Sequence, residues 1–76
     1  MPVTASFSRY DLRNAEDRIA EIRGYIAREQ SKLNGLQADS TEAASIRQTL
    51  SALGRTLDHF QDHRAHIERD LRGRST

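Results

Sequence analysis

Two runs of residues, spaced alternately three and four positions apart and almost all apolar, constrain the fold of this chain more than any other feature. A repeat that averages 3.5 residues is typical of helices packed as a coiled coil or a helix bundle. The first run is Leu12, Ala15, Ile19, Ile22, Ile26, Glu29, Leu33 and Leu36. The second run is Ala43, Ile46, Leu50, Leu53, Leu57, Phe60, Arg64, Ile67 and Leu71. We call these positions the seam, and they predict two long helices.

The first helix has a recognisable start signal. Ser8, followed three residues later by Asp11, resembles a capping box, in which two side chains satisfy backbone N–H groups reciprocally. Phe7 precedes the cap and is placed to pack on Leu12 as a hydrophobic staple. The only proline is Pro2, so no proline interrupts either run.

A short break between the runs fixes how the helices are connected. It begins near Gly35, and Asp39 with Glu42 repeats the capping pattern for the second helix. A connection this short makes the two helices antiparallel neighbours. We therefore predict a single domain over residues 1–76, with an N-terminal arm 1–7, helices 8–36 and 40–72, a turn 37–39 and a frayed tail 73–76.

Two antiparallel helices cover only one side of each other, so a lone hairpin leaves much of its seam in water. A chain of 76 residues also buries only a small core by itself. The usual remedy is to pair two hairpins into a four-helix bundle. We expect an all-α, coiled-coil-like antiparallel hairpin that forms a homodimeric four-helix bundle, with another helical protein as the alternative partner.

Two charged residues, Glu29 and Arg64, interrupt the apolar seam. Within one hairpin they lie about 21 Å apart along the axis, so they cannot meet. An antiparallel two-fold dimer centred at the level of Ile22 and Leu57 places Glu29 of one chain level with Arg64 of the other. Such a pair sets the register of a bundle. In the alternative, Arg64 extends past the small Ala15 to water and Glu29 leans outward.

Gly54 falls beside Tyr25 when the chain is folded about its turn. One interpretation is that the missing side chain makes room for the tyrosine ring. The other is that Gly54 only weakens its helix, by about 1 kcal/mol relative to Ala.

A strip of His59, His63 and His66, bordered by Asp62, forms the only candidate metal site in the sequence. On a helix these histidines share one side, and two His four residues apart can bind one transition-metal ion. However, the strip lies off the seam, and the sequence has neither an HExxH motif nor the paired Glu-x-x-His motifs of di-iron bundles. We expect a solvated polar face with no metal and no cofactor.

The composition argues against catalysis. The chain has no Cys, no Gly-rich phosphate loop and no Ser-centred elbow, and a thin hairpin offers no deep pocket for a substrate. We therefore expect no enzyme activity. The start MPVTASFSRYD lacks the features of a signal peptide, and no apolar run approaches the length of a membrane span, which predicts a cytoplasmic protein without membrane contact.

Nucleic-acid binding is the alternative function. Charge is balanced at a formal +1, but five arginines gather at the open end of the predicted hairpin: Arg9, Arg13, Arg69, Arg72 and Arg74. Phe7 and Tyr10 lie there as possible stacking residues, and dimeric hairpins of the Rop type bind structured RNA on a bundle face. The simpler interpretation is that these arginines pair with the acidic residues around them. We expect a small non-catalytic interaction or regulatory protein, acting through self-association and protein–protein binding.

The segment 39–71 resembles small Arg-rich helical-hairpin proteins of alpha-proteobacteria. The shared features are a D-x-T-E-A helix start at 39–43 and the pattern His63-Arg64-Ala65-His66-Ile67, and the stretch 19-IAEIRGYIAREQSKLNGL-36 is similar in kind. The resemblance implies a bacterial, cytoplasmic helical hairpin. It supplies no activity, cofactor or site residue.

Overall fold

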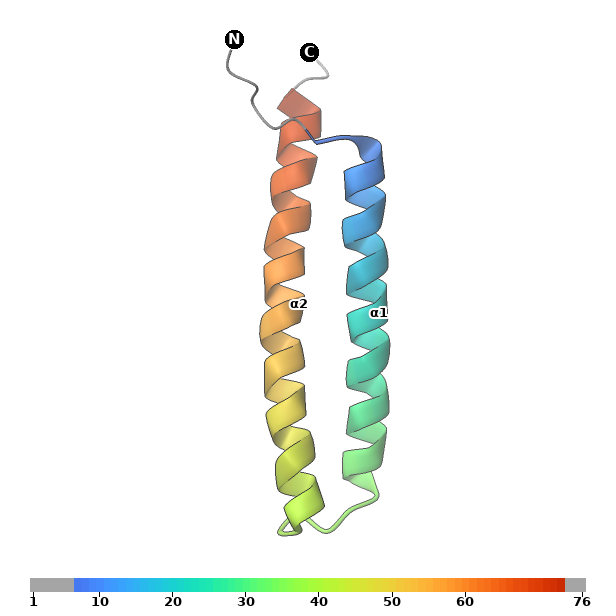
Figure 1. Cartoon of the computed structure of the whole chain (residues 1–76), viewed down its shortest axis with the longest axis vertical. Coiled ribbons are helices and arrows are strands. Elements are labelled where there is room, and N and C mark those ends of the chain that lie inside the picture. The colour runs from blue at the N-terminus through green and yellow to red at the C-terminus, as the bar shows by residue number, and fades with distance from the viewer. Residues whose placement is uncertain (1–6, 74–76) are drawn as a thin grey trace.

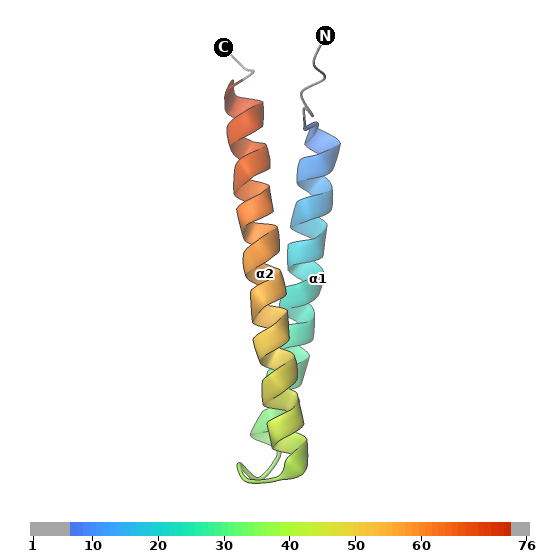
Figure 2. The ribbon, with the colours of Figure 1, turned by 60° about the vertical axis from the view of Figure 1, so that its left-hand side comes forward.

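The computed structural model describes residues 7–73, which form two helices, α1 (Arg9–Asn34) and α2 (Thr41–Gly73). The helices lie side by side and run in opposite directions, joined at one end by a short connection (Figures 1 and 2). The Cα positions span 57 × 19 × 14 Å, so the molecule is a rod only one helix layer thick. The predicted all-α antiparallel hairpin is confirmed.

The capping box predicted for α1 is present. The Asp11 backbone N–H donates to Ser8 Oγ at 3.2 Å, and the Ser8 backbone N–H donates to Asp11 Oδ2 at 2.7 Å. The ring of Phe7 lies edge-on against His63 and His66 of α2, with centroids 5.6 and 5.9 Å away. Phe7, which precedes α1, therefore packs on α2. The hydrophobic staple between Phe7 and Leu12 stays a prediction.

The connection is longer than the predicted turn because α1 ends at Asn34 and α2 begins at Thr41. The backbone N–H groups of Gly35 and Leu36 bond back three residues, both at 3.1 Å, which tightens the last turn and ends the helix. At its other end α2 extends through Gly73, one residue beyond the expected limit. Differences of this size are ordinary at helix ends.

The cap of α2 is Ser40 and not Asp39, so that prediction is wrong. Ser40 Oγ accepts from the Ala43 backbone N–H at 3.0 Å, and the Ser40 carbonyl accepts from Ala44 at 3.1 Å. Ser40 is thus the half-helical residue at which a side-chain oxygen reaches the third helical N–H. Arg47 ties the connection to α2 by donating from Nη2 to the Ala38 carbonyl at 2.6 Å.

The seam lies along the contact between the helices but is only partly covered. Five of its residues are buried: Ala15, Ile19, Ile22, Ala43 and Ile67. The other twelve are half-buried, and no polar or charged residue among 7–73 is buried. A lipid bilayer could not be crossed by either helix of this range, since neither combines the necessary length and apolar character.

Candidate functional site

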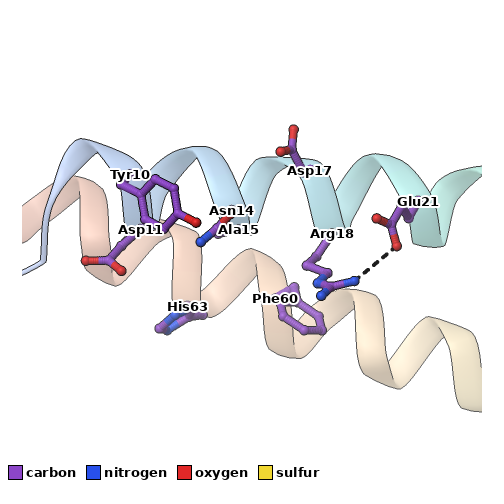
Figure 3. A pocket seen from close by; sticks show the side chains of 9 residues that line it. All are labelled: Tyr10, Asp11, Asn14, Ala15, Asp17, Arg18, Glu21, Phe60 and His63. Carbon is purple, nitrogen blue, oxygen red and sulfur yellow. Dashed lines mark hydrogen bonds and ion pairs between the residues drawn. The ribbon is translucent and has the colours of Figure 1, made fainter.

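Two grooves run along one face of the hairpin, on either side of its midpoint. The open-end groove lies near the termini, where α1 contributes Asp11, Ala15 and Arg18 and α2 contributes Phe60 and His63 (Figure 3). Asp17 and Glu21 also line this groove, and Arg18 Nη1 pairs with Glu21 Oε2 at 3.3 Å. The groove therefore carries three carboxylates and one guanidinium.

The turn-end groove has the opposite charge balance. It is lined from α1 by Tyr25, Arg28, Glu29 and Lys32, and from α2 by Thr49 and Leu53. The Arg28 guanidinium lies 5.0 Å from the centroid of the Tyr25 ring, a cation–π contact. In both grooves seam residues lie between charged side chains, Ala15 and Phe60 in the open-end groove and Leu53 in the turn-end groove.

The two charged seam residues have only local partners within residues 7–73. Glu29 pairs with Lys32 at 3.6 Å, although its side chain is only 23% exposed. Arg64 Nε lies 3.9 Å from Glu68 Oε1, which is too long for a hydrogen bond. That nitrogen is buried and makes no hydrogen bond among the described residues. An unsatisfied buried donor is costly, by about 1–3 kcal/mol or more when charged.

The histidine strip is divided between two packing contacts. His63 and His66 lie against Phe7, while His59 lies edge-on to Phe60 of its own helix at 5.6 Å. Within the range 7–73, no three His, Cys, Asp or Glu side chains come together in a way that could hold a metal ion. The proposed set with Asp62 is therefore not assembled in the described structure.

The four described arginines of the open end are exposed. None of Arg9, Arg13, Arg69 and Arg72 forms an ion pair within residues 7–73, and Arg74 lies outside that range. The expected neutralisation by neighbouring acids is not seen there, because three of those acids have other partners and Asp17 forms no ion pair among residues 7–73. Asp11 belongs to the cap, Glu68 pairs with Arg64, and Asp70 accepts from the Phe7 backbone N–H at 3.2 Å.

The two aromatic residues of the open end differ in accessibility. Tyr10 is 70% exposed and available to a partner. Phe7 is half-buried with its ring against the two histidines, so it is less accessible than Tyr10 for stacking on a base.

Of the two interpretations of Gly54, the structure favours the one in which it makes no room for the Tyr25 ring. A Cβ built on Gly54 meets no described atom of a neighbouring side chain or of the other helix within 4 Å. The tyrosine ring, 48% exposed, is held by Arg28 of its own helix.

Sequence reasoning did not single out the charged residues beside the seam of α1, among them Arg18, Arg28 and Lys32, which line the grooves. The heptad itself contained the signal, since residues that flank a seam select partners and orientation in coiled coils. Comparison with protein-family models, curated proteins and solved structures finds no match for the chain.

Proposed function

We propose that this protein is a small non-catalytic interaction or regulatory protein that acts through self-association and protein–protein binding. In this proposal two hairpins pair along their seams as a dimeric four-helix bundle. The observation that carries it is the incomplete burial of the seam, because twelve of its residues, including Ile26, Leu33 and Leu50, keep a part of their surface in water.

The accessible surface supports a missing partner of similar size. The 8.6 kDa chain exposes 6020 Å², whereas a compact monomer of that mass is expected to expose about 4,700 Å². The difference of about 1,300 Å² exceeds the roughly 800 Å² that each partner contributes to an interface of standard size. A second hairpin laid on one face would cover an area of this order.

The polar seam residues support a fixed register. In the antiparallel dimer, Glu29 of one copy reaches the level of Ala15 and Arg64 of the other, and the small Ala15 leaves space for the long arginine. The buried Arg64 Nε then gains an acceptor that the single hairpin does not provide. Charged pairs of this kind act on register and orientation more than on overall stability.

Light scattering at micromolar to sub-millimolar concentration tests self-association. The expected result is a dimer mass that is unchanged when zinc is added. A monomer at every concentration contradicts the proposal. A dimer that forms only with zinc would instead indicate a functional metal site at His59, His63 and His66.

A charge exchange tests the register. The variants Glu29→Arg and Arg64→Glu should each weaken the dimer by at least about tenfold, because each leaves two like charges in the seam. The double variant should recover most of the loss. A double variant as weak as the sum of the two single variants contradicts the pairing while leaving self-association intact.

Binding of structured RNA by such a dimer is the second candidate. The observation that favours it is the set of exposed arginines without ion pairs among residues 7–73, which lies beside the exposed Tyr10. A tagged pull-down from the native host, with and without nuclease, separates the candidates. Recovered protein partners that survive nuclease support protein–protein binding, whereas nuclease-sensitive recovery and a steep salt dependence support RNA binding.

A further inference from the structure

One row of side chains connects the two grooves of the hairpin. The residues directly before four seam positions of α1 are Asp11, Arg18, Tyr25 and Lys32, and we call them the flank row. The first two line the open-end groove and the last two line the turn-end groove. The row therefore lies on one face, with its two halves on opposite sides of the Ile22 level.

We propose that the flank row docks against the flank row of a second copy with the two α1 helices antiparallel. This inference rests on the proposed self-association and adds the face and orientation of the dimer. A two-fold axis near Ile22 turns one hairpin end over end, so that its α1 lies against α1 of the other. Asp11 of each copy then meets Lys32 of the other, and Arg18 meets Tyr25.

Charge complementarity selects this orientation. Each antiparallel dimer has two Asp11–Lys32 pairs of opposite charge, placed where each acidic open-end groove faces a basic turn-end groove. A parallel dimer would instead set Asp11 against Asp11, Arg18 against Arg18 and Lys32 against Lys32. Like charges at flanking positions exclude the wrong orientation as effectively as opposite charges favour the right one.

The seam and the second helix agree with this selection. A parallel arrangement would also place Glu29 against Glu29 inside the seam, where its side chain is only 23% exposed. The corresponding row of α2 ends in Glu42 and Asp70, which give like-charged pairs in both orientations. The orientation is therefore determined by α1.

The Tyr25 ring is suited to its assigned contact. Arg28 covers one side of the ring at 5.0 Å, and the residue remains 48% exposed. A tyrosine ring has two faces, each able to bind a cation, so the guanidinium of Arg18 from the second copy can take the open one. Arg18 itself lies at the surface, paired only with the exposed Glu21 among residues 7–73.

Cysteine pairing tests the orientation, since the chain has no cysteine of its own. Two variants of the full chain, Arg18→Cys and Tyr25→Cys, are oxidised separately and as an equal mixture. In the antiparallel dimer the two positions face each other, so only the mixture should form a covalent dimer, with one chain of each kind. Identical cysteines would stand about 10 Å apart along the axis, beyond the roughly 7 Å that a disulfide spans between Cα atoms.

Light scattering of the reduced variants gives their molar mass, and circular dichroism gives their helix content. With these two measurements each outcome of the oxidation has a single interpretation. Covalent dimers from each variant alone indicate a parallel dimer and overturn the orientation, while self-association stands. A reduced dimer that gives no covalent product in the mixture overturns the docking face. A helical monomer removes the proposed self-association as well.

A matched pair of charge reversals sharpens the result. Lys32→Glu replaces both Asp11–Lys32 pairs with repulsions, removes the Glu29–Lys32 pair within each chain, and should weaken the dimer by about 5- to 30-fold at low salt. Arg23→Glu makes the same change of charge at an exposed position off the flank row and should leave the dimer within about twofold. Equal effects of the two variants contradict the assigned face.

Discussion

The two ends of the hairpin carry the same seam but bury it to different extents. Towards the termini Ala15, Ile19 and Ile67 are buried, and Ile67 has no exposed surface. Towards the turn, residues such as Leu33 and Ile46 stay half-buried, and only the small Ala43 is covered. This difference in burial does not come from a difference in hydrophobicity, because large apolar seam residues occur at both ends.

The open end has a third segment that the turn end lacks among the described residues. At the open end the described chain before α1 crosses over to α2 (Figure 1). The Phe7 ring lies against His63 and His66, and the Phe7 backbone N–H donates to Asp70. At the turn end the connection is held by Arg47 but adds no aromatic cover among the described residues. The two ends therefore differ in whether a further segment packs on α2 beside the seam.

Replacing matched isoleucines at the two ends gives the largest expected difference. Ile67→Ala should lower the free energy of unfolding by about 2–4 kcal/mol, because it leaves a cavity at a buried site. Ile46→Ala, at the same heptad position in the half-buried end, should cost about half as much when the chain is dilute. Urea unfolding at several protein concentrations measures both.

The concentration dependence of these two losses separates the ends further. If a second copy covers the turn end, the cost of Ile46→Ala should rise with protein concentration towards that of Ile67→Ala. Equal costs at the lowest concentration would show that the two ends are covered alike within a single hairpin.

Loss of the contacts between the third segment and α2 should lower the stability of the open end towards that of the turn end. Phe7→Ala deletes two edge-on ring contacts and half-buried apolar surface, with an expected cost of about 1–1.5 kcal/mol. Tyr10→Ala is the control, because this ring is 70% exposed and its loss should cost less than about 0.5 kcal/mol. Thermal unfolding followed by circular dichroism distinguishes them, and equal shifts would mean that the Phe7 contacts add no stability.

The turn end has its own test in the cap of α2. Ser40→Ala should cost about 1 kcal/mol, because the Ala43 N–H loses its acceptor. Asp39→Ala should be nearly neutral, since its neighbour holds the cap. The reverse order in chemical denaturation would restore Asp39 as the capping residue.

The same comparison shows what the sequence could predict. The heptad predicted both helices, because seam spacing depends only on helical geometry, and the short connection between them predicted their antiparallel packing. It could not decide between Asp39 and Ser40, since both are good caps and only the path of the connection selects one. Leu36 continues the heptad spacing although α1 ends at Asn34. The spacing of apolar residues does not reveal the backbone hydrogen bonds that tighten the last turn and end the helix.

Contacts outside the heptad were the least predictable. Phe7 precedes α1 and its ring rests on α2, a contact between residues more than fifty positions apart that no local pattern encodes. The candidate metal strip shows the converse, because His63 and His66 share one side of the helix as expected but face an aromatic ring. Spacing along a helix predicts which side chains are neighbours and leaves open what lies opposite them.

Gly54 gives the smallest expected effect and the most direct test between the two interpretations that the sequence left open at this position. Because a Cβ there meets no neighbouring side chain or atom of the other helix, Gly54→Ala should stabilise the hairpin by about 0.5–1 kcal/mol, through the higher helix propensity of alanine. Gly24→Ala in α1 has equally open surroundings and should give a similar gain. If Gly54→Ala destabilises the protein while Gly24→Ala stabilises it, the space at Gly54 is occupied in solution. A loss that grows with protein concentration would then place a second copy there, on the side of the seam opposite the flank row.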